Sequence, residues 1–222
     1  MRLTVLLFAA AREAAGTSRL SLDLPEGATV ASLRAALAER LPALDPLWPY
    51  LQVAVDREIA APESPLRDGQ EIALLPPVAG GAGSETGRFR ITAEPIALAD
   101  AERLVRGPAF GGLVGFAGAV RGESRGRRVA RLEYEAYAPM ALAQLTAIGE
   151  RLERAHGARL SILHRVGVLA VGEIAVALCA AAPHRREAFR ACEAAIDALK
   201  AEAAIWKREV YEDGASWVGL GP

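Results

Sequence analysis

Two lysines near the end of the chain are the residues whose type and spacing best suit chemistry. Lys200 and Lys207 lie seven residues apart, and Arg208 follows the second directly. Cations this close each disfavour the other's charge, and a lysine whose pKa is lowered in this way becomes a usable base or nucleophile. Ordinary surface charge is the alternative interpretation of the same pattern.

Other basic residues stand where a helix is expected to begin and where a strand is expected to end. Pro183, His184, Arg185 and Arg186 precede an amphipathic segment, so helix N–H groups and two guanidinium groups could bind an anion there. A solvated basic cap is the alternative. Arg121 is a weaker candidate, at the end of a glycine-bearing, strand-like run.

A pair of glycines, Gly80 and Gly81, follows the run PPVA in mid-chain. Two residues without Cβ can thread a narrow channel and leave the last carboxylate accessible, which ubiquitin-like carriers exploit. A flexible linker is the alternative. The position of the pair, directly after the last expected strand of residues 1–81, favours the carrier.

The elements that must position these residues fall on two sides of a boundary. Residues 75–88, LPPVAGGAGSETGR, have no hydrophobic period to pack them. A helix is expected from Thr29, its N-cap, because apolar residues recur on one face after it. Before the boundary, strands are expected at residues 3–8, 20–24, 52–55 and 71–75, a small β-grasp pattern. The first run also imitates a signal peptide, but it is short and has one flanking cation, so we favour a buried strand.

Beyond the boundary, strands and helices intermix without strict alternation, which indicates an α+β fold. Strands are expected at residues 89–92, 113–121, 130–137, 160–166 and 174–180, and helices at 98–105, 140–155 and 184–201. In the last helix, Phe189, Cys192, Ile196 and Leu199 recur at spacings of 3, 4 and 3, which predicts one buried stripe.

Several separated motifs stand in register between about residue 88 and residue 219. They are LEYEAY (132–137), HRVG (164–167), PHRREAF (183–189) and IWKREVYEDG (205–214), closed by Trp217 and Val218. Together they resemble the large catalytic subunit of the molybdopterin synthase family, and residues 1–81 with their PPVAGG ending resemble its small sulfur carrier. The resemblance implies three parts: a β-grasp, ubiquitin-like carrier (1–81), a Gly/Ser linker (82–87) and an α/β-hammerhead-like catalytic domain (88–222).

The resemblance also implies an activity. It is that of a sulfurtransferase of molybdenum cofactor biosynthesis, which moves two sulfurs from a thiocarboxylate on Gly81 to cyclic pyranopterin monophosphate and forms the dithiolene of molybdopterin. Lys200 and Lys207 match the catalytic lysines. The substrate-binding positions of the family correspond to Arg121, His184, Arg185, Lys200, Lys207, Arg208 and Glu209. Two departures are Ala204, where proline is common in the family, and Ala119, where some members carry lysine.

Partners and location follow from composition and from the resemblance. The 26 basic and 27 acidic residues form no long run of one sign, so proteins and small molecules are expected as partners rather than nucleic acid or membranes. Cys179 and Cys192 lack the paired spacing of a zinc site, and are expected to be buried in a protein of the reducing cytosol. His156 and His164 are expected to be structural, with no metal site. The resemblance implies no permanently bound cofactor and an E1-like adenylyltransferase that charges Gly81 with sulfur.

Two expectations concern assembly and processing. His184 and Lys200 are sixteen residues apart, about 24 Å along a continuous helix, too far for one small pterin to touch both. We therefore expect a homodimer in which His184 and Arg185 of one chain face Lys200 and Lys207 of the other. Gly81 is in peptide linkage to Ala82, whereas a thiocarboxylate needs a free carboxyl group, so cleavage after Gly81 is expected.

Two alternative functions stay open at the level of sequence. The chain could be a non-catalytic scaffold in which the glycine pair is only a linker. The carrier half could also serve another sulfur-transfer or conjugation pathway.

Overall fold

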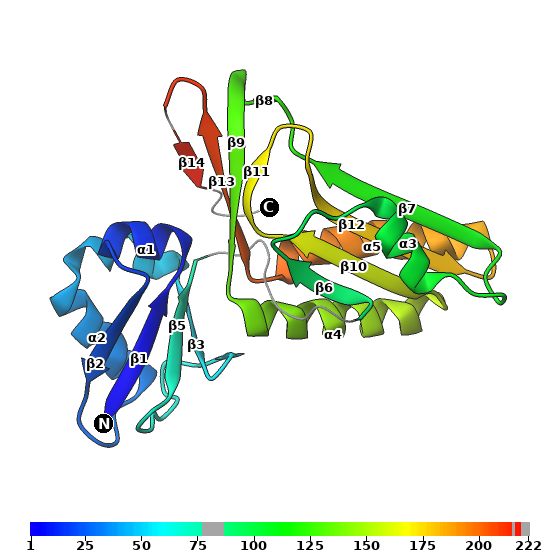
Figure 1. Ribbon diagram of the computed structural model, residues 1–222. Coiled ribbons are helices and arrows are strands. Elements are labelled where there is room, and N and C mark those ends of the chain that lie inside the picture. Colours follow the sequence, from blue (N-terminus) through cyan, green and yellow to red (C-terminus); the bar gives the residue numbers. More distant parts are fainter. Residues whose placement is uncertain (77–86, 215, 219–222) are drawn as a thin grey trace. The chain divides into compact units, whose positions relative to one another are not determined.

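The computed structural model describes residues 1–76, 87–214 and 216–218 (Figure 1). The chain divides into two compact units, Met1–Pro77 and Val78–Pro222, and this division falls inside the predicted boundary. Gly80, Gly81 and residues 82–86 of the predicted linker lie outside the described residues.

The first unit is a five-stranded sheet covered by helices, and the β-grasp prediction is confirmed. Its elements are β1 (Arg2–Leu7), α1 (Ala9–Ala15), β2 (Arg19–Asp23), α2 (Val30–Arg40), the 3-10 helix η1 (Pro42–Tyr50), β3 (Gln52–Val55), β4 (Glu58–Ile59) and β5 (Glu71–Leu75). The strand order is β2-β1-β5-β3-β4, with β1 and β5 parallel. The run that imitates a signal peptide is β1, in which Leu3, Val5 and Leu7 are fully buried.

Helix α2 begins where the sequence predicts. The Thr29 hydroxyl accepts a hydrogen bond from the Ser32 N–H, and the Ser32 hydroxyl accepts one from the Thr29 N–H, which forms a reciprocal cap. Val30, Leu33 and Leu37 are buried and pack against the sheet in the core of this unit. The apolar spacing therefore reported the buried face of α2 correctly.

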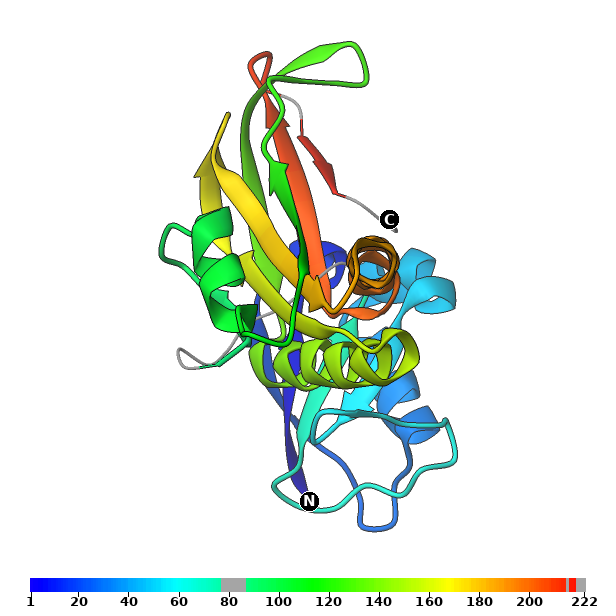
Figure 2. The same ribbon diagram turned by 90° about the vertical axis from the view of Figure 1, so that its right-hand side faces the viewer.

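The second unit contains two sheets. Its elements are β6 (Phe89–Thr92), α3 (Leu98–Val105), β7 (Gly112–Ala119), β8 (Glu123–Ser124), β9 (Arg127–Ala136), α4 (Ala138–His156), β10 (Arg159–Arg165), β11 (Gly167–Ala170), β12 (Ile174–Ala182), α5 (Arg185–Glu202), β13 (Ile205–Tyr211) and β14 (Ser216–Val218). One sheet has the order β6-β10-β12-β7, and the other has the order β11-β9-β13-β14, with β8 forming a hairpin with β9. Figure 2 shows α3 on one side of the first sheet and α4 and α5 on the other.

Helix α5 is held close to the first sheet by small residues. Its buried side chains are Ala188, Ala191, Cys192, Ala195 and Leu199. At its start, a Cβ on Gly112 of β7 would lie only 2.9 Å from the Arg185 backbone nitrogen, so glycine is required for this approach.

One sequence prediction about α5 is wrong. Phe189 was expected in the buried stripe, but 61% of its surface is exposed. The alanine face packs on the strands instead, because small side chains allow the closest contact between helix and sheet.

Cys179 and Cys192 are buried as predicted, and burial raises the pKa of each thiol to about 11.

Candidate active site

Strand β13 carries three of the predicted site residues, Lys207, Arg208 and Glu209, and their side chains lie on two different faces of the sheet. Lys207 lies opposite Tyr134 of β9, and Arg208 lies opposite Glu133. Because side chains alternate along a strand, Lys207 and Glu209 share the face of Tyr134, while Arg208 stands on the other face. There the Arg208 Nη2 donates to the Ser216 hydroxyl at 3.3 Å.

Lys207 is bound to a buried carboxylate. Its Nζ lies 3.1 Å from Oε1 of Glu209, whose other oxygen accepts a hydrogen bond from the Tyr211 hydroxyl at 2.9 Å. Glu209 is only 4% exposed. Burial raises the pKa of Glu209, but hydrogen bonds from Ser124, Tyr211 and Lys207 outweigh it and hold that pKa below its ordinary value. Glu209 is therefore an ionised carboxylate at neutral pH.

An aromatic and a histidine side chain border this pair. The Tyr134 and His164 rings meet edge to face, with centroids 5.1 Å apart. Burial, and secondarily the charge of Glu209, raises the pKa of Tyr134 to about 12. Burial lowers the pKa of His164 to about 4, against the opposing effect of its hydrogen bond to the Arg165 carbonyl. Both rings are thus neutral at pH 7.

Lys200 is exposed in the last turn of α5, a short turn before β13. An ion pair between Arg151 of α4 and Glu202, with Nη1 and Oε2 3.0 Å apart, links this end of α5 to α4. The Ala204 N–H donates to Oε1 of Gln144 at 2.8 Å. Proline has no N–H, so this hydrogen bond fixes the turn before Lys207 by a means that proline does not offer.

His184 and Arg185 lie at the opposite end of α5. His184 is the N-cap residue with extended backbone, Arg185 is the first helical residue, and both are exposed. The helix is unbroken to Glu202, so the separation of about 24 Å from Lys200 stands. One chain therefore does not bring these two residues to one small ligand.

Arg121 lies just after the C-terminal end of β7, whereas His184 lies near the N-terminal end of that strand. β7 begins at Gly112, beside the start of α5, and Arg121 follows its last residue, Ala119, by two positions. Helix α5 packs along both β7 and β12, so Lys200 lies toward the Arg121 end of β7.

The structure thus divides the predicted site residues. Lys207 and Glu209 are in contact, and Lys200 is joined to them by a short turn. His184 and Arg185 lie apart, and Arg208 lies on the other face of its sheet. The sequence did not indicate Tyr134, Tyr211 or Ser124, although the two tyrosines lie inside the motifs that carry the resemblance.

Two further features of the described residues bear on the site. In residues 1–76, 87–214 and 216–218, no group of three or more His, Cys, Asp or Glu side chains is arranged to hold a metal ion. In the same ranges, no helix is both long and apolar enough to cross a membrane.

Comparison with known families assigns both parts of the chain. The model of the MoaE protein family matches residues 91–202, and that of the ThiS family matches residues 5–81.

Named relatives match the second part. The molybdopterin synthase catalytic subunit of Bacillus subtilis is 44% identical over 133 residues, 60% of this chain and 85% of the relative. Catalytic subunit 1 of Mycobacterium tuberculosis is 45% identical over 134 residues, 60% of this chain and 91% of the relative.

A solved structure supports the same assignment. The crystal structure of molybdopterin synthase from Staphylococcus aureus matches with a TM-score of 0.58 and 38% identity, covering 61% of this chain and 98% of that one. Because the MoaE model spans half of this sequence and the ThiS model precedes it, the chain belongs to the MoaE family, with a ThiS-family domain joined ahead of it.

Proposed function

We propose that this chain is a molybdopterin synthase in which sulfur carrier and catalytic subunit are made as one polypeptide. Two charged carriers in turn each give up the one sulfur of a Gly81 thiocarboxylate to cyclic pyranopterin monophosphate and are left as Gly81 carboxylates, and the dithiolene of molybdopterin forms. The relatives of the second half bear the name of this enzyme's catalytic subunit. The ThiS model ends at residue 81, the residue that must carry the sulfur.

The observation that carries the proposal is the chain's use of lysine. Lys200 and Lys207 are its only lysines, and all other cationic side chains of the 26 Lys and Arg residues are arginine. Arginine stays protonated in proteins, whereas a lysine amine can release its proton or attack a carbonyl. A chain that uses arginine everywhere else and lysine at these two positions points to amine chemistry there.

The two lysines have different surroundings, which supports different roles. Lys200 is exposed at a helix end and is proposed as the principal amine, for proton transfer or a transient covalent link. Lys207 is paired with Glu209 and is proposed as a fixed cation that stabilises an anionic intermediate. Arg121, His184 and Arg185 are proposed to hold the phosphate and the pterin. Arg208, predicted to share this role, lies on the other face of its sheet from Lys207. Glu209, being buried, is proposed to act through Lys207.

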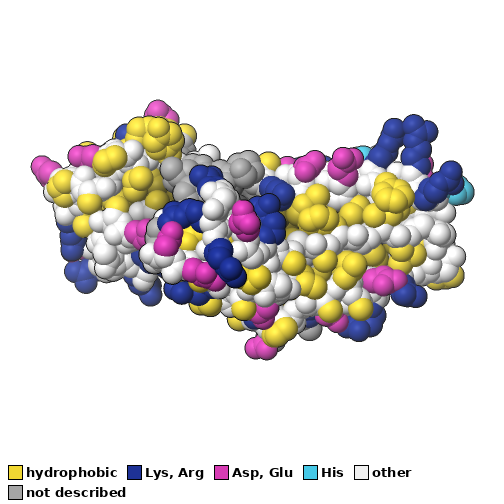
Figure 3. All heavy atoms as spheres, turned by 90° about the horizontal axis from the view of Figure 1, so that it is seen from above, with side chains coloured by type: hydrophobic (Ala, Val, Ile, Leu, Met, Phe, Trp, Pro, Cys, Tyr) yellow, Lys and Arg dark blue, Asp and Glu magenta, His cyan; other side chains and the backbone are white. Residues whose placement is uncertain are grey.

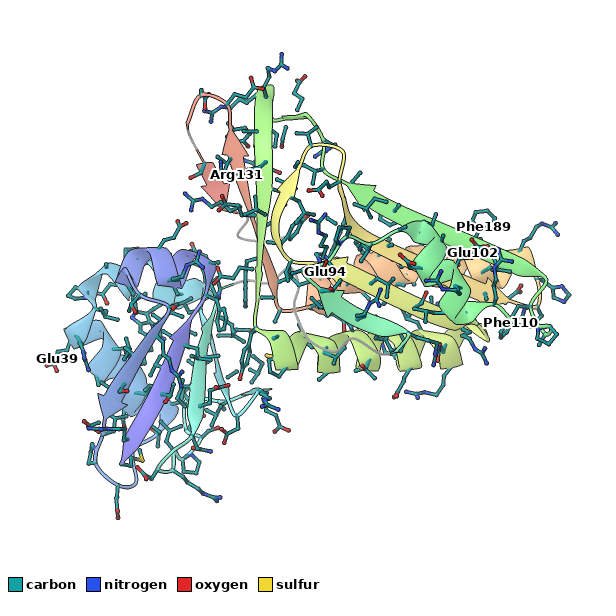
Figure 4. The ribbon with its side chains drawn as sticks, in the orientation of Figure 1. Glu39, Glu94, Glu102, Phe110, Arg131 and Phe189 are labelled. Atoms are coloured by element: carbon teal, nitrogen blue, oxygen red, sulfur yellow. The ribbon has the colours of Figure 1, made fainter. Side chains whose placement is uncertain are left out.

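A homodimer is proposed to complete each pocket. β7 is an edge strand of the sheet β6-β10-β12-β7 as far as the chain is described, and Leu113 on it is 38% exposed. Figure 4 shows the Phe189 side chain projecting away from the ribbon. In Figure 3, hydrophobic side chains spread over the right-hand part of the molecule, where β7 and α5 lie in Figure 1, with basic side chains at its end.

If the two-fold axis of the dimer passes near the middle of β7 and α5, residues that are far apart in one chain come together between the two chains. It would bring the His184 end of one chain to the Arg121 and Lys200 end of the other, because both elements run between these ends. This arrangement accounts for the 24 Å separation within one chain, about 1.5 Å for each helical residue.

Charging and processing complete the proposal. Gly81 must be freed by cleavage before Ala82, and an E1-like adenylyltransferase would then replace its carboxyl oxygen with sulfur. No permanently bound cofactor is proposed for this chain, and the cytoplasm is the proposed location.

Reconstitution tests the function. The purified chain, cleaved after Gly81 and supplied with thiocarboxylated carrier of residues 1–81 and cyclic pyranopterin monophosphate, is expected to form molybdopterin. The Lys200→Ala chain is expected to lose at least about 100-fold in rate, the usual contribution of a general acid or base. A Lys200→Ala chain as fast as the parent would contradict the assignment. Parent chain without activity would contradict the proposed function itself.

A further inference from the structure

We infer that Tyr211 and the β8–β9 hairpin are a positioning device for Lys207, acting through Glu209. The inference rests on the proposed function and adds residues to its machinery. It begins from an unbroken series of contacts that leads from the exposed tip of the hairpin to the amine of Lys207.

The outer contacts hold the Tyr211 ring. The Arg127 guanidinium carbon lies 4.4 Å from the ring centroid, and its Nε donates to Oδ2 of Asp213 at 3.1 Å. Tyr211 is 3% exposed and packs with Val129 and Leu132 in a core cluster. The ring is therefore held by a paired arginine over its face and by the apolar side chains packed with it.

A strand irregularity makes this packing possible. The register of β9 and β13 shifts between Val210 and Tyr211, so Tyr211 lies opposite Val129 and Ala130 is passed over. Such a bulge re-aims side chains and turns Val129 into the core beside Tyr211.

The inner contacts pass from the ring to the lysine. The Tyr211 hydroxyl donates to Oε2 of Glu209 at 2.9 Å, and Ser124 of β8 also hydrogen-bonds this carboxylate. Oε1 of Glu209 is left to face Lys207 Nζ at 3.1 Å. A carboxylate whose position is fixed by hydrogen bonds offers Oε1 in one direction, so it orients the ammonium group rather than only neutralising it.

This arrangement matters because Lys207 is a long, flexible side chain. Its stem has four rotatable carbons, and an unanchored ammonium group would sample many positions. A displacement of about 1 Å at a reacting centre can cost about 100-fold in rate. Tyr211 is inferred to act on Lys207 through the Glu209 carboxylate that both contact, so it is a positioning residue.

The charged and titratable groups around Glu209 and its partner Tyr211 come from two strands and one turn. They are Lys207 and Tyr211 on β13, Tyr134 on β9, Arg127 at the start of β9, and Arg125 in the hairpin turn, which faces Tyr211. Loss of the Tyr211 hydroxyl removes one of the hydrogen bonds that lower the Glu209 pKa, so that pKa should rise toward its ordinary value.

The test compares Tyr211→Phe with the parent chain in reconstitution with thiocarboxylated carrier. We expect kcat to fall about tenfold and the acid limb of the kcat profile to move to higher pH, because Glu209 takes up a proton earlier. Tyr137→Phe is the matched control, since Tyr137 is also 3% exposed. It should leave the acid limb in place.

A double-mutant cycle decides whether Tyr211 acts through Lys207. Tyr211→Phe should have no further effect on the rate in a Lys207→Ala chain. An equal loss in both backgrounds, or an unmoved acid limb, would overturn the inference. A parent chain that makes no molybdopterin would instead contradict the proposed function.

A spectroscopic readout needs no activity. With [¹⁵N]lysine the chain gives only two Nζ signals, because it has only two lysines. Tyr211→Phe and Glu209→Gln should move the Lys207 signal and leave the Lys200 signal in place. Movement of neither signal, or of both equally, would overturn the inference.

Discussion

At the scale of single residues, the clearest feature is the contrast between two lysines and the arginines around them. Lys207 is tied to a buried carboxylate at 3.1 Å, while Lys200 stands exposed at the end of α5. The resemblance implies that both lysines are catalytic but does not separate their roles. The separation depends on a strand partner and on burial, which no spacing along the chain reveals.

Lysine-to-arginine substitution tests this separation. Lys200→Arg keeps the charge but removes a releasable proton, so we expect a loss of at least about 100-fold in kcat. Lys207→Arg keeps the cation beside Glu209, so we expect a loss nearer tenfold. Steady-state rates of dithiolene formation measure both. Equal losses in the two variants would contradict the division of roles.

His164 makes the stability of the second unit depend on pH. Burial lowers its pKa to about 4, so the unfolded chain binds a proton below about 6.5 that the folded chain does not. Stability should therefore fall by about 2 kcal/mol from about pH 7 to about pH 5, above the range where carboxylates titrate. Hydrogen exchange of buried β10 amides measures this, and His164→Phe should flatten the dependence. An equal slope in both chains would refute the assignment.

At the scale of elements, the sequence predicted helices and strands with a clear apolar pattern, and it missed elements whose pattern is interrupted by charged residues or prolines. The α2 face and the extent of α5 follow from apolar spacing, and the structure confirms them. β13 was not predicted as a strand, because Lys207, Arg208 and Glu209 interrupt its apolar residues. The 3-10 helix η1 was also missed, since its prolines indicate a turn or loop.

Phe189 shows the limit of periodicity. Apolar residues that recur on one face of a helix indicate that this face is buried. They do not indicate whether it is buried by the same chain or by a partner chain. Here the chain covers its alanine face and leaves Phe189 exposed. We interpret Phe189 as part of the proposed dimer surface.

Substitution of Phe189 tests that surface. Phe189→Glu should convert the dimer to a monomer at micromolar concentration, because a central aromatic contact contributes about 2 kcal/mol or more and each dimer loses two. Val168→Glu on β11 is a matched control, since Val168 is 62% exposed and Phe189 61%. Analytical ultracentrifugation measures both variants. A parent chain that is already monomeric would contradict the dimer.

A mixing experiment tests whether the dimer shares its sites. His184→Ala and Lys200→Ala chains should each be inactive, but a re-equilibrated mixture should regain about a quarter of the parent's sites. The regained activity comes from mixed dimers in which one pocket has both residues intact. A mixture as inactive as its components would contradict a shared pocket.

At the scale of the whole molecule, the glycine pair is both the expected sulfur-bearing end and a position inside the chain. The ThiS model ends at residue 81, and the MoaE model begins at residue 91 of the same polypeptide. Synthesis as one chain supplies carrier and catalytic domain in equal amounts. The proposed reaction nevertheless needs a free carboxyl group at Gly81, so the proposal requires cleavage before sulfur transfer.

An intact-mass spectrum of the protein isolated from its native host tests this claim most directly. The account predicts a carrier that ends at Gly81, part of it heavier by the exchange of one oxygen for sulfur, and a second chain that begins at Ala82. Detection of only the full-length chain, in cells that make the molybdenum cofactor, would contradict it.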